Sequence, residues 1–572
     1  MLLLRYVEKG DAPVLRDPIT AEVVSNYLLS VADQVNETIV RCSFNPNIKE
    51  RRDCSAVLLD GRGPVVAQPE HNPAHLGSLM YMGEEVLQKY GDAVYPGDVF
   101  IHNDPYTRGS SHLNDFTLIT PIFHQGELMF FAVNTAHHVD VGGRVPGSTA
   151  PDSQSLFEEG IQIPLVRLMH KGKLNQDLLQ VICWNCRDPA EREADIKGQI
   201  AANEIAREPL ERLCARYGNA RLRTILDDIL AYSRQRAYQI IQELPDGRYT
   251  ATSYLDDDGL GGAPVPITVT ACIEGHRLTF DFTGSGPQAR GAFNASETIL
   301  KASVYWAFKA MLDPDMPATS GFFDALTIVA PEGSIVNPRP GAAVGVRVDT
   351  AQKIADAVIR ALNQALPPER RVAGSHAVNS GLIFSGYDPF RQRSFAFIET
   401  FGGGGGARAG KDGLDGIHVY MVNPSNLPIE VLEREYPLRV ERYGLVVDSC
   451  GPGQFRGGLG IRRDVRVLAD EIFVTTRSES QRQGAWGIEG GGSGRPAYTC
   501  KNPGTPQEER LPGKRSQIPL RKGDVVSLQT PGGGGVGLPV HRKPEQVWND
   551  VLDGIISPAF AQTVYGISPP LS

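Results

Sequence analysis

Histidine and aspartate side chains gather in one stretch of the chain, between residues 101 and 143. This stretch contains five of the twelve histidines. Four of its side chains have the types that bind a divalent metal through imidazole nitrogen and carboxylate oxygen: His112, Asp115, His137 and His138. Grouped at the end of a hairpin, in loops rich in Asn and Gly, they suit a metal that keeps one coordination position open.

A β-hairpin is predicted to bring these four side chains together. Residues 116–123 and 128–133 are rich in β-branched and aromatic side chains, which is typical of strands. Residues 124–126 (His-Gln-Gly) are predicted to form a three-residue loop with glycine in the left-handed position of a bulge. Two strands that leave one turn together also end together, so residues before the first strand meet residues after the second.

The length of the loop decides which histidine faces Asp115. With a three-residue loop Asp115 faces Thr135, and His137 lies one pair further out on the same face. A two-residue turn would instead favour His138 on that face. The sequence leaves this choice open.

Ordinary structural roles compete with the metal site. A single histidine is more often a hydrogen-bonded polar residue than a ligand, and Asp104 and Asp140 are each followed by turn residues typical of Asx-turns. Four candidate ligands that converge on one hairpin end nevertheless favour a metal site.

A second predicted hairpin, over residues 54–68, also delivers polar groups to one end. The flanking side chains are Glu50, Asp53, His71 and His75. Asp53 could be the further carboxylate of the first cluster, because divalent sites usually take three or more protein ligands. The alternative is a surface ion pair with Arg51 or Arg52.

The pattern as a whole predicts an α+β fold, a multi-layer mixed α/β chain in which β-hairpins carry the metal site and the C-terminal portion is β-rich. At 572 residues the chain exceeds what one core usually serves. The predicted parts are a metal-site N-terminal domain (1–245), a mixed α/β middle domain with a Gly-rich loop (246–470), a β-rich C-terminal portion (471–542) and a helical tail (543–572).

Local signals place several helix ends. Apolar periodicity predicts a helix over 18–38 with Thr20 as a possible N-cap, and a helical region over 201–242 that breaks near Gly218. Asp188, followed by a proline, has the pattern of an N-cap and first helical residue.

The Gly-rich loop at 401–412 resembles a phosphate loop without fulfilling its requirements. GGARAGKD, from Gly405 to Asp412, has the G-x4-G-K spacing, but Asp412 stands where Ser or Thr would hold magnesium. A turn and a strand follow instead of a helix. The loop is interpreted as backbone that comes close to another group rather than as a nucleotide site.

Bulk properties exclude several classes of protein. A net charge of −9 with a pI near 5.8 argues against nucleic acid as a partner. No apolar run approaches the roughly 18 residues that span a bilayer, so we expect no membrane contact and a cytoplasmic protein. Eight cysteines in a chain of this length do not form a disulfide framework, and the isolated pair Cys183 and Cys186 is interpreted as two ordinary thiols.

Taken in order, several sequence blocks resemble the hydantoinase B/oxoprolinase family, over nearly the whole chain. This family includes N-methylhydantoinase B subunits, the second half of ATP-dependent 5-oxoprolinase, caprolactamase and relatives in acetone carboxylase. The blocks are IKERRDCSAVLLD, PAHLGSL, NDPYTRGSSHLNDFT, AHHVDVGG, FGGGGGAR, DGIH, PIEVLEREYPLRV, FRGGLG and TPGGGG.

The resemblance implies a metal-containing subunit of a hetero-oligomer. Its partner would be a hydantoinase A-like ATPase that uses ATP and Mg to phosphorylate a small cyclic amide, and this chain would complete hydrolysis of the C–N bond. The metal would be zinc, manganese or iron. Carried over from the family motif, the ligands are His112, Asp115 and His137, with Asp53 as the fourth and Glu50 as a possible extra.

Two histidines are hypothesised to move protons at this site, His138 and His75. Two other functions fit the resemblance. One is a subunit of an ATP-dependent ketone carboxylase of the acetone carboxylase type, and the other is a non-catalytic scaffold with a structural cluster.

Overall fold

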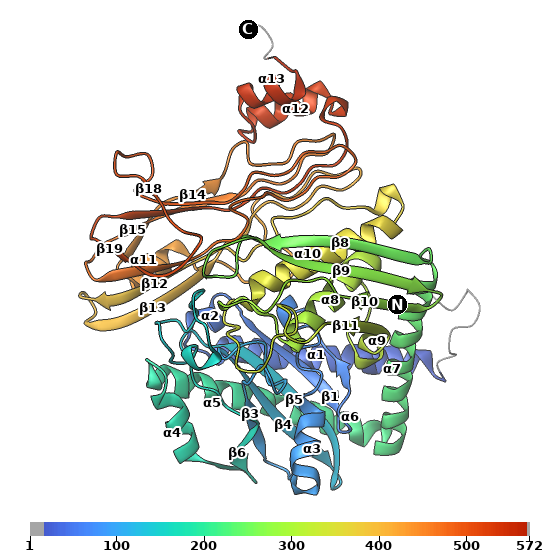
Figure 1. The fold of residues 1–572 in the computed structure, drawn as a ribbon. Coiled ribbons are helices and arrows are strands. Elements are labelled where there is room, and N and C mark those ends of the chain that lie inside the picture. The colour runs from blue at the N-terminus through green and yellow to red at the C-terminus, as the bar shows by residue number, and fades with distance from the viewer. Residues whose placement is uncertain (1–15, 569–572) are drawn as a thin grey trace.

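The structure is a computed structural model that describes residues 16–568. Helices and four sheets alternate in layers, so the predicted α+β class is confirmed. In Figure 1 the elements before residue 245 (blue to green) form the lower part, and the elements that follow (light green to yellow) lie above them. The C-terminal sheets (orange) extend to the upper left, and α12 and α13 lie at the top.

The lower part is built on a seven-stranded antiparallel sheet with the order β2-β1-β5-β4-β3-β6-β7. Its strands are β1 (Cys54–Asp60), β2 (Val65–Ala67), β3 (Val99–His102), β4 (Asp115–His124), β5 (Glu127–His137), β6 (Val166–His170) and β7 (Lys173–Leu174). Its helices are α1 (Pro18–Cys42), α2 (Pro46–Lys49), α3 (Met82–Tyr90), α4 (Gln176–Trp184), α5 (Pro189–Ile205), α6 (Arg207–Tyr217) and α7 (Asn219–Gln242).

Both faces of this sheet are buried, and β5 shows how the sequence divides them. Phe130 and Ala132 pack with α1, α6 and α7. Phe131 and Val133 instead join the core formed with residues 247–365, which are called the middle layer below. Because successive side chains of a strand point to opposite faces, the odd-numbered residues of β5 from Phe131 onward face the middle layer, whereas Met129, at the register shift, packs on the other face. His137 therefore points toward that layer.

The β4–β5 turn differs from the prediction. His124 pairs with Glu127, so the loop has two residues, Gln125 and Gly126, both with positive φ. A bulge between Ile122 and Phe123 then shifts the register by one residue. The predicted three-residue loop is wrong. Because of the bulge, however, Asp115 and His137 still lie on the same face of the hairpin, as that loop would have placed them.

This turn predicts a stabilising substitution at Gln125. Its φ of 52° lies in the left-handed region, which asparagine adopts more readily than glutamine and which a two-residue hairpin turn requires. We expect Gln125→Asn to raise the free energy of unfolding by about 0.5 kcal/mol, measured from the urea midpoint. Gln125→Ala, which gains no such preference, is the control, and equal stabilisation by both would contradict the explanation.

The middle layer contains a four-stranded sheet with the order β11-β10-β9-β8, in which β10 and β11 are parallel. Its elements are β8 (Gly247–Leu255), β9 (Val265–Glu274), β10 (Arg277–Asp281), α8 (Glu297–Leu312), α9 (Ser320–Phe323), β11 (Leu326–Val329) and α10 (Arg347–Ala365). Helix α10 packs against α8 and against β8 and β9, and most of its side chains are buried. Its first turn is directed toward the lower sheet.

Two further sheets form the C-terminal part, with the orders β13-β12-β16-β19 and β14-β15-β20-β17-β18. Their elements are β12 (Gly381–Asp388), β13 (Arg393–Thr400), α11 (Ile429–Glu435), β14 (Leu438–Leu445), β15 (Ile461–Val467), β16 (Ile472–Arg477), β17 (Tyr498–Lys501), β18 (Glu509–Arg510), β19 (Lys514–Leu520) and β20 (Val525–Gln529). Both sheets contain strands from either side of residue 470. The domain boundaries from the sequence stay predictions.

Glycine-rich segments pack side by side between these sheets and the two C-terminal helices, α12 (Pro544–Leu552) and α13 (Pro558–Tyr565) (Figure 1). The segments are 402–406, 451–460, 484–494 and 531–537. Gly533 N–H donates to Gly458 O at 2.9 Å, and Gly458 N–H donates to Gly405 O at 2.8 Å. The loop at 401–412 therefore brings backbone close to other glycine backbone, and the helical tail is present as predicted.

Several helix ends follow the local signals. Helix α6 ends at Tyr217, Gly218 has a φ of 75°, and α7 begins at the next residue. The side chain of Asp188 caps α5 by accepting the N–H of Glu191. Helix α1 is a correction, because its N-cap is Asp17, which accepts the N–H of Thr20, and not Thr20 itself.

Candidate metal centre

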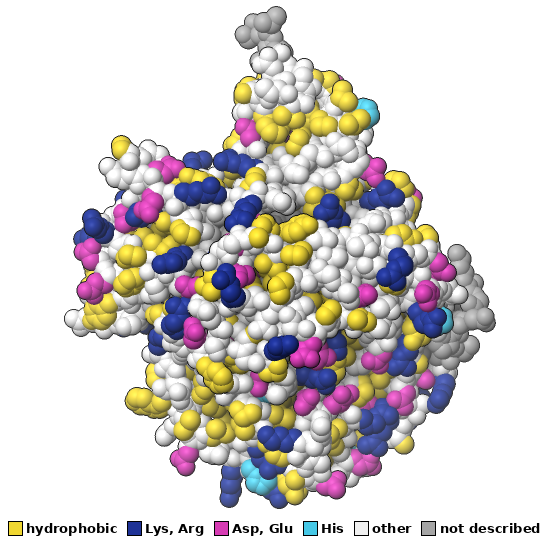
Figure 2. Space-filling model, viewed as in Figure 1, with side chains coloured by type: hydrophobic (Ala, Val, Ile, Leu, Met, Phe, Trp, Pro, Cys, Tyr) yellow, Lys and Arg dark blue, Asp and Glu magenta, His cyan; other side chains and the backbone are white. Residues whose placement is uncertain are grey.

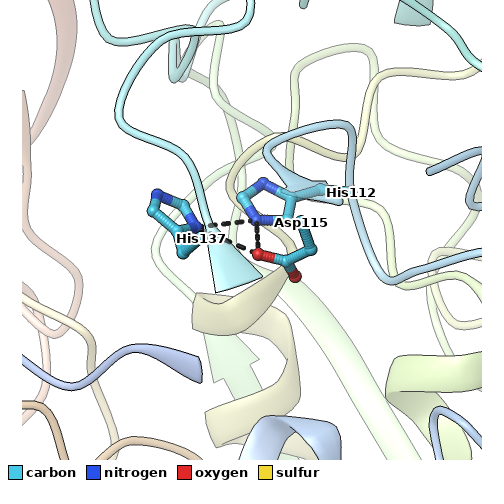
Figure 3. A group of neighbouring side chains, drawn as sticks. All are labelled: His112, Asp115 and His137. Atoms are coloured by element: carbon cyan, nitrogen blue, oxygen red, sulfur yellow. Dashed lines mark hydrogen bonds and ion pairs between the residues drawn. The ribbon is translucent and has the colours of Figure 1, made fainter. Parts of the chain in front are cut away.

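Three of the predicted side chains converge on one point, as Figure 3 shows. His112 Nε2 lies 3.0 Å from Asp115 Oδ1, and His137 Nδ1 lies 3.1 Å from the same oxygen. The two ring nitrogens are 3.1 Å apart. Ligand atoms at 2.0–2.1 Å from a tetrahedral metal would lie about 3.4 Å from one another. The observed spacing therefore fits one divalent ion with little movement.

The hairpin and its loop create this geometry. Asp115, the first residue of β4, pairs directly with His137, the last residue of β5. His112 lies one turn earlier, because the Asp115 N–H donates to the His112 carbonyl at 3.3 Å. The loop is anchored by Asn103, whose side-chain amide donates to Leu113 O at 2.8 Å.

Buried neighbours control the charge of Asp115. Its Oδ2 accepts from Ser111 Oγ at 3.2 Å and from Arg347 Nη2 at 3.1 Å, while Oδ1 faces the two imidazoles. Burial raises the pKa of this carboxyl, but His112 and Arg347 outweigh it and hold the pKa well below its usual range. Asp115 is therefore an ionised carboxylate, as a metal ligand must be.

His112 is held in the form that binds metals. Burial, followed by the positive charge of Arg347, lowers the pKa of this imidazole well below its usual value. The ring is neutral at physiological pH, so one nitrogen carries a free lone pair. Its Nδ1 is buried and has no hydrogen-bond partner among residues 16–568, whereas Nε2 points at the other two ligand atoms.

Asp53 lies beside this group rather than within it. Its carbonyl accepts the N–H of His137 at 3.0 Å, and its carboxylate accepts from Asn72 Nδ2 at 2.5 Å. It lines the same cavity as His112 and His137, but it is not among the ligand atoms that lie within 4.8 Å of one another. Glu50, the C-cap of α2, is not in that group either.

The two histidines hypothesised to move protons lie in different places. His75 Nε2 is 3.7 Å from Asp115 Oδ2, and its Nδ1 is 2.8 Å from Ser55 Oγ. The ring of His138 instead lies on the α5 side of the hairpin, between Arg192 and Gln199. Since both of its ring nitrogens are occupied there, His138 orients the hairpin end and does not face the three ligands.

Other candidate residues have ordinary structural roles instead of metal binding. Asp104 Oδ1 accepts the N–H of Tyr106 at 2.9 Å, and Asp140 Oδ1 accepts the N–H of Gly142 at 2.9 Å. Both are Asx-turns, as the sequence suggested. Cys183 and Cys186 are buried free thiols, which agrees with their interpretation.

Sequence reasoning missed the arginines of this site. Arg347, the first residue of α10, reaches Asp115 across 232 positions of sequence. Arg51 and Arg477 line the same cavity, together with Asp53 and both cluster histidines. No local motif marks an arginine as a neighbour of a distant carboxylate, so only the packing of the layers reveals them.

The fold and the buried His–Asp–His group define a mixed α/β protein with a candidate metal centre between two of its layers. The chain belongs to the hydantoinase B/oxoprolinase family, whose model matches residues 17–539.

Relatives along the whole chain agree with this. A protein of Pseudomonas sp. (strain NS671) that is named as a D-/L-hydantoinase B subunit is 32% identical, over 96% of this chain and 95% of the relative. The 5-oxoprolinase of Dictyostelium discoideum is 29% identical, over 91% of this chain but only 40% of the relative. The region shared with this chain is thus less than half of that longer protein.

Solved structures share the fold. The ATP-dependent caprolactamase of Pseudomonas jessenii has a TM-score of 0.88 and 28% identity, and the match covers 97% of each chain. Nucleotide-free acetone carboxylase has a TM-score of 0.87 and 20% identity, over 96% of this chain and 80% of the other. The second likeness, at its low identity, concerns the fold alone.

The surface carries charged side chains of both signs. On the face shown in Figure 2, Lys and Arg side chains are interspersed with Asp and Glu side chains. No helix within residues 16–568 has both the length and the apolar character needed to cross a membrane.

Proposed function

We propose that this chain is the metal-containing subunit of an ATP-dependent cyclic amide hydrolase, and that it completes C–N bond hydrolysis on a substrate phosphorylated by a partner ATPase. The observation that carries the proposal is the convergence of three ligand atoms within 4.8 Å of one another, from the buried His112 and Asp115 and the half-buried His137. The names of the relatives, a hydantoinase B subunit and a 5-oxoprolinase, support the reaction class.

The chemical logic is a division of labour between two subunits. An amide nitrogen is a poor leaving group, and phosphorylation of the carbonyl oxygen makes the ring carbon more electrophilic. A divalent metal held at this site would lower the pKa of bound water toward about 7 and so supply hydroxide at neutral pH. Arg347 and Ser111 fix the Asp115 carboxylate in its ionised, metal-binding orientation.

Asp53 is proposed as the fourth ligand. Asp53 lines the cavity together with His112 and His137, and within residues 16–568 its carboxylate accepts from one side-chain donor, Asn72 Nδ2. His75 is proposed as the proton carrier, because its Nε2 faces Asp115 Oδ2 at 3.7 Å and Ser55 fixes the ring through Nδ1.

An open cleft of about 640 Å³ beside the cavity offers space for a substrate ring. Asn72 lines both spaces, so it forms part of the wall between them. Aromatic and aliphatic side chains of the cleft, among them Trp306, Tyr232 and Met316, suit the apolar part of a cyclic amide. We propose that substrate approaches the metal centre from this cleft.

The partner follows from the relatives. One is named as a B subunit, which implies a second subunit, and the 5-oxoprolinases are longer single chains. We therefore propose a hetero-oligomer with a hydantoinase A-like ATPase that uses ATP and Mg.

An activity panel tests the reaction class. The chain is assayed with its co-expressed ATPase partner and ATP against hydantoins, 5-oxoproline and lactams, and in parallel against ketones with bicarbonate. We expect ATP-dependent ring opening of a cyclic amide. Carboxylation of a ketone without ring opening would replace the proposal by the acetone carboxylase type, and no activity in either arm would support a scaffold.

Metal analysis tests the site independently of substrate. Mass spectrometry of the purified protein is expected to show one zinc, manganese or iron per chain, removable by a chelator together with activity and restored by re-addition. Apo protein with full activity would contradict the proposed centre.

A further inference from the structure

Three buried arginines line the small cavity that also contains His112 and His137. Arg51, Arg347 and Arg477 are between 3% and 7% exposed, and all three line the cavity with His112 and His137. They come from three parts of the fold: the segment after α2, the first turn of α10, and the end of β16. Gathering three buried guanidinium groups is costly unless something compensates their charge.

Arg477 has unused hydrogen-bonding capacity. Its Nε donates to Asp349 Oδ2 at 2.6 Å, whereas its Nη2 is buried with no partner among residues 16–568. A buried donor without a partner loses about 1–3 kcal/mol of hydration, more when it is charged. An arginine that pairs through one nitrogen and leaves an outer one free is oriented to receive a further acceptor.

Arg51 also has unused hydrogen-bonding capacity. Its Nη1 and Nη2 donate only to neutral oxygens, including Ile398 O at 2.9 Å and Thr400 Oγ1 at 2.7 Å, and its Nε has no partner in the described chain. Burial lowers the pKa of Arg51, and the negative charges of Asp53 and Glu399 oppose this effect.

Arg347 is the third member and connects the arginines to the metal group. It donates to Asp115 Oδ2 at 3.1 Å and to Ser111 Oγ at 2.9 Å. Among the hydrogen bonds of the described residues, Arg347 and Arg477 thus each have one carboxylate partner, and Arg51 has none.

We propose that Arg51, Arg347 and Arg477 form an oxyanion subsite next to the metal ligands, and that this subsite holds the phosphoryl group of the activated substrate. The assignment of the phosphoryl group rests on the proposed function, whereas the oxyanion subsite rests on the arginines alone. Guanidinium forks match the geometry of phosphate oxygens, and the oxygens of a phosphomonoester can accept hydrogen bonds from the unpartnered nitrogens of Arg51 and Arg477.

The size of the cavity supports a compact group. Its volume of about 40 Å³ admits a few water molecules and not a substrate ring. The ring would remain in the adjoining cleft, on the other side of Asn72, while its phosphorylated oxygen enters between the arginines and the metal ligands. The subsite would thereby hold the phosphorylated oxygen while the reacting carbon lies beside the metal ligands and the ring nitrogen is free to leave.

Calorimetric titration of inorganic phosphate tests the subsite without ATP, partner or substrate. Phosphate is titrated into the full chain, metal-free and metal-loaded, and we expect saturable binding to one site per chain in both. Arg477→Lys and Arg51→Lys each keep a positive charge but lose the unpartnered nitrogen, and each is expected to weaken phosphate binding about tenfold. Metal content is expected to stay at one ion per chain.

Arg542→Lys is the matched control. Arg542 is also a buried arginine held by two aspartates, Asp412 and Asp550, but it lies in the C-terminal part of the chain, outside the cavity. The Arg542→Lys substitution is expected to lower the melting temperature and to leave the phosphate affinity unchanged. A comparable loss of affinity in this variant would show that destabilisation explains the effect, and would overturn the subsite.

Further outcomes separate the subsite from the proposed function. Absence of saturable phosphate binding, or unchanged affinity in both cavity variants, would overturn the subsite even if the enzyme opens cyclic amides. Parallel titrations with acetate and bicarbonate distinguish the anion: tighter binding of either than of phosphate would overturn the phosphoryl assignment. Phosphate binding in a chain that shows no hydrolase activity would support the subsite and count against the hydrolase alone.

Discussion

Asp115→Asn is expected to abolish metal binding and turnover while leaving the fold intact. Asparagine has the volume of aspartate, but one of the two carboxylate oxygens is replaced by an amide nitrogen that cannot accept a hydrogen bond. Oδ1 faces both imidazoles, and Oδ2 accepts from Ser111 and Arg347. Either orientation of the amide therefore removes the metal ligand or leaves Arg347 opposite a donor.

The expected loss of activity exceeds about 100-fold, because removing a partner of a ligand already costs about 10- to 100-fold in metal affinity or activity. His112→Ala should have the same effect by removing a ligand nitrogen. Metal content by mass spectrometry and turnover in the assembled complex are the measurements. Circular dichroism and size-exclusion chromatography with the ATPase partner report whether fold and assembly survive.

Asp104→Asn is the matched control, because it changes an aspartate of the same loop. Asp104 caps an Asx-turn through Oδ1, and asparagine can accept the same N–H of Tyr106. Metal content and turnover should stay near those of the unmodified chain. If Asp115→Asn kept its metal and its activity, the proposed centre would be wrong and a scaffold role would gain support.

The convergence of the three candidate ligands could be predicted because it is local. His112, Asp115 and His137 lie within one hairpin, and a hairpin joins its two ends whatever the details of its turn. The turn itself was predicted wrongly, since the bulge at Ile122 and Phe123 leaves no clear signal in the sequence. His137 still faces Asp115, because the register shift at the bulge compensates for the shorter loop. The family resemblance also indicates His137.

The surroundings of the centre could not be predicted, because they depend on layer packing. Arg347 and Arg477 reach the cavity from elements more than 200 residues away from the hairpin. The direction in which Asp53 and His138 point is likewise set by Asn72 and Gln199, which lie on other elements. Residue types and spacing identify candidate ligands, but charge compensation is a property of the packed protein.

The packing of the glycine-rich segments could be predicted only in part: the sequence indicates that each is a turn or loop, but not that they contact one another. Local composition marks turns, and each tract could be interpreted as a separate loop. The structure shows instead that the tracts hydrogen-bond to one another. Only residues without a side chain permit extended segments to approach so closely, as in the collagen triple helix. Steric demand therefore accounts for the run of glycines at 402–406.

Gly533→Ala is accordingly expected to prevent the C-terminal part from folding correctly. A Cβ at this position would lie 2.0 Å from Gly405 O, a backbone atom of another segment. Neither segment can retreat independently, because Gly533 also donates to Gly458 O and accepts from Gly451 N–H, at 2.9 and 2.8 Å. The expected cost exceeds about 4 kcal/mol, the range of exceptional substitutions.

Gly444→Ala is the control for the loss of a glycine as such. Gly444 lies in β14, and a Cβ there would meet no atom within 4 Å. Soluble yield, melting temperature and limited proteolysis should match the unmodified chain for Gly444→Ala and collapse for Gly533→Ala. A stable Gly533→Ala protein would mean that the glycine segments can separate, which would remove the steric reason for their composition. Because β20 leads directly into the segment at 531–537 and pairs with β15 and β17, such a separation would also have to disrupt that sheet.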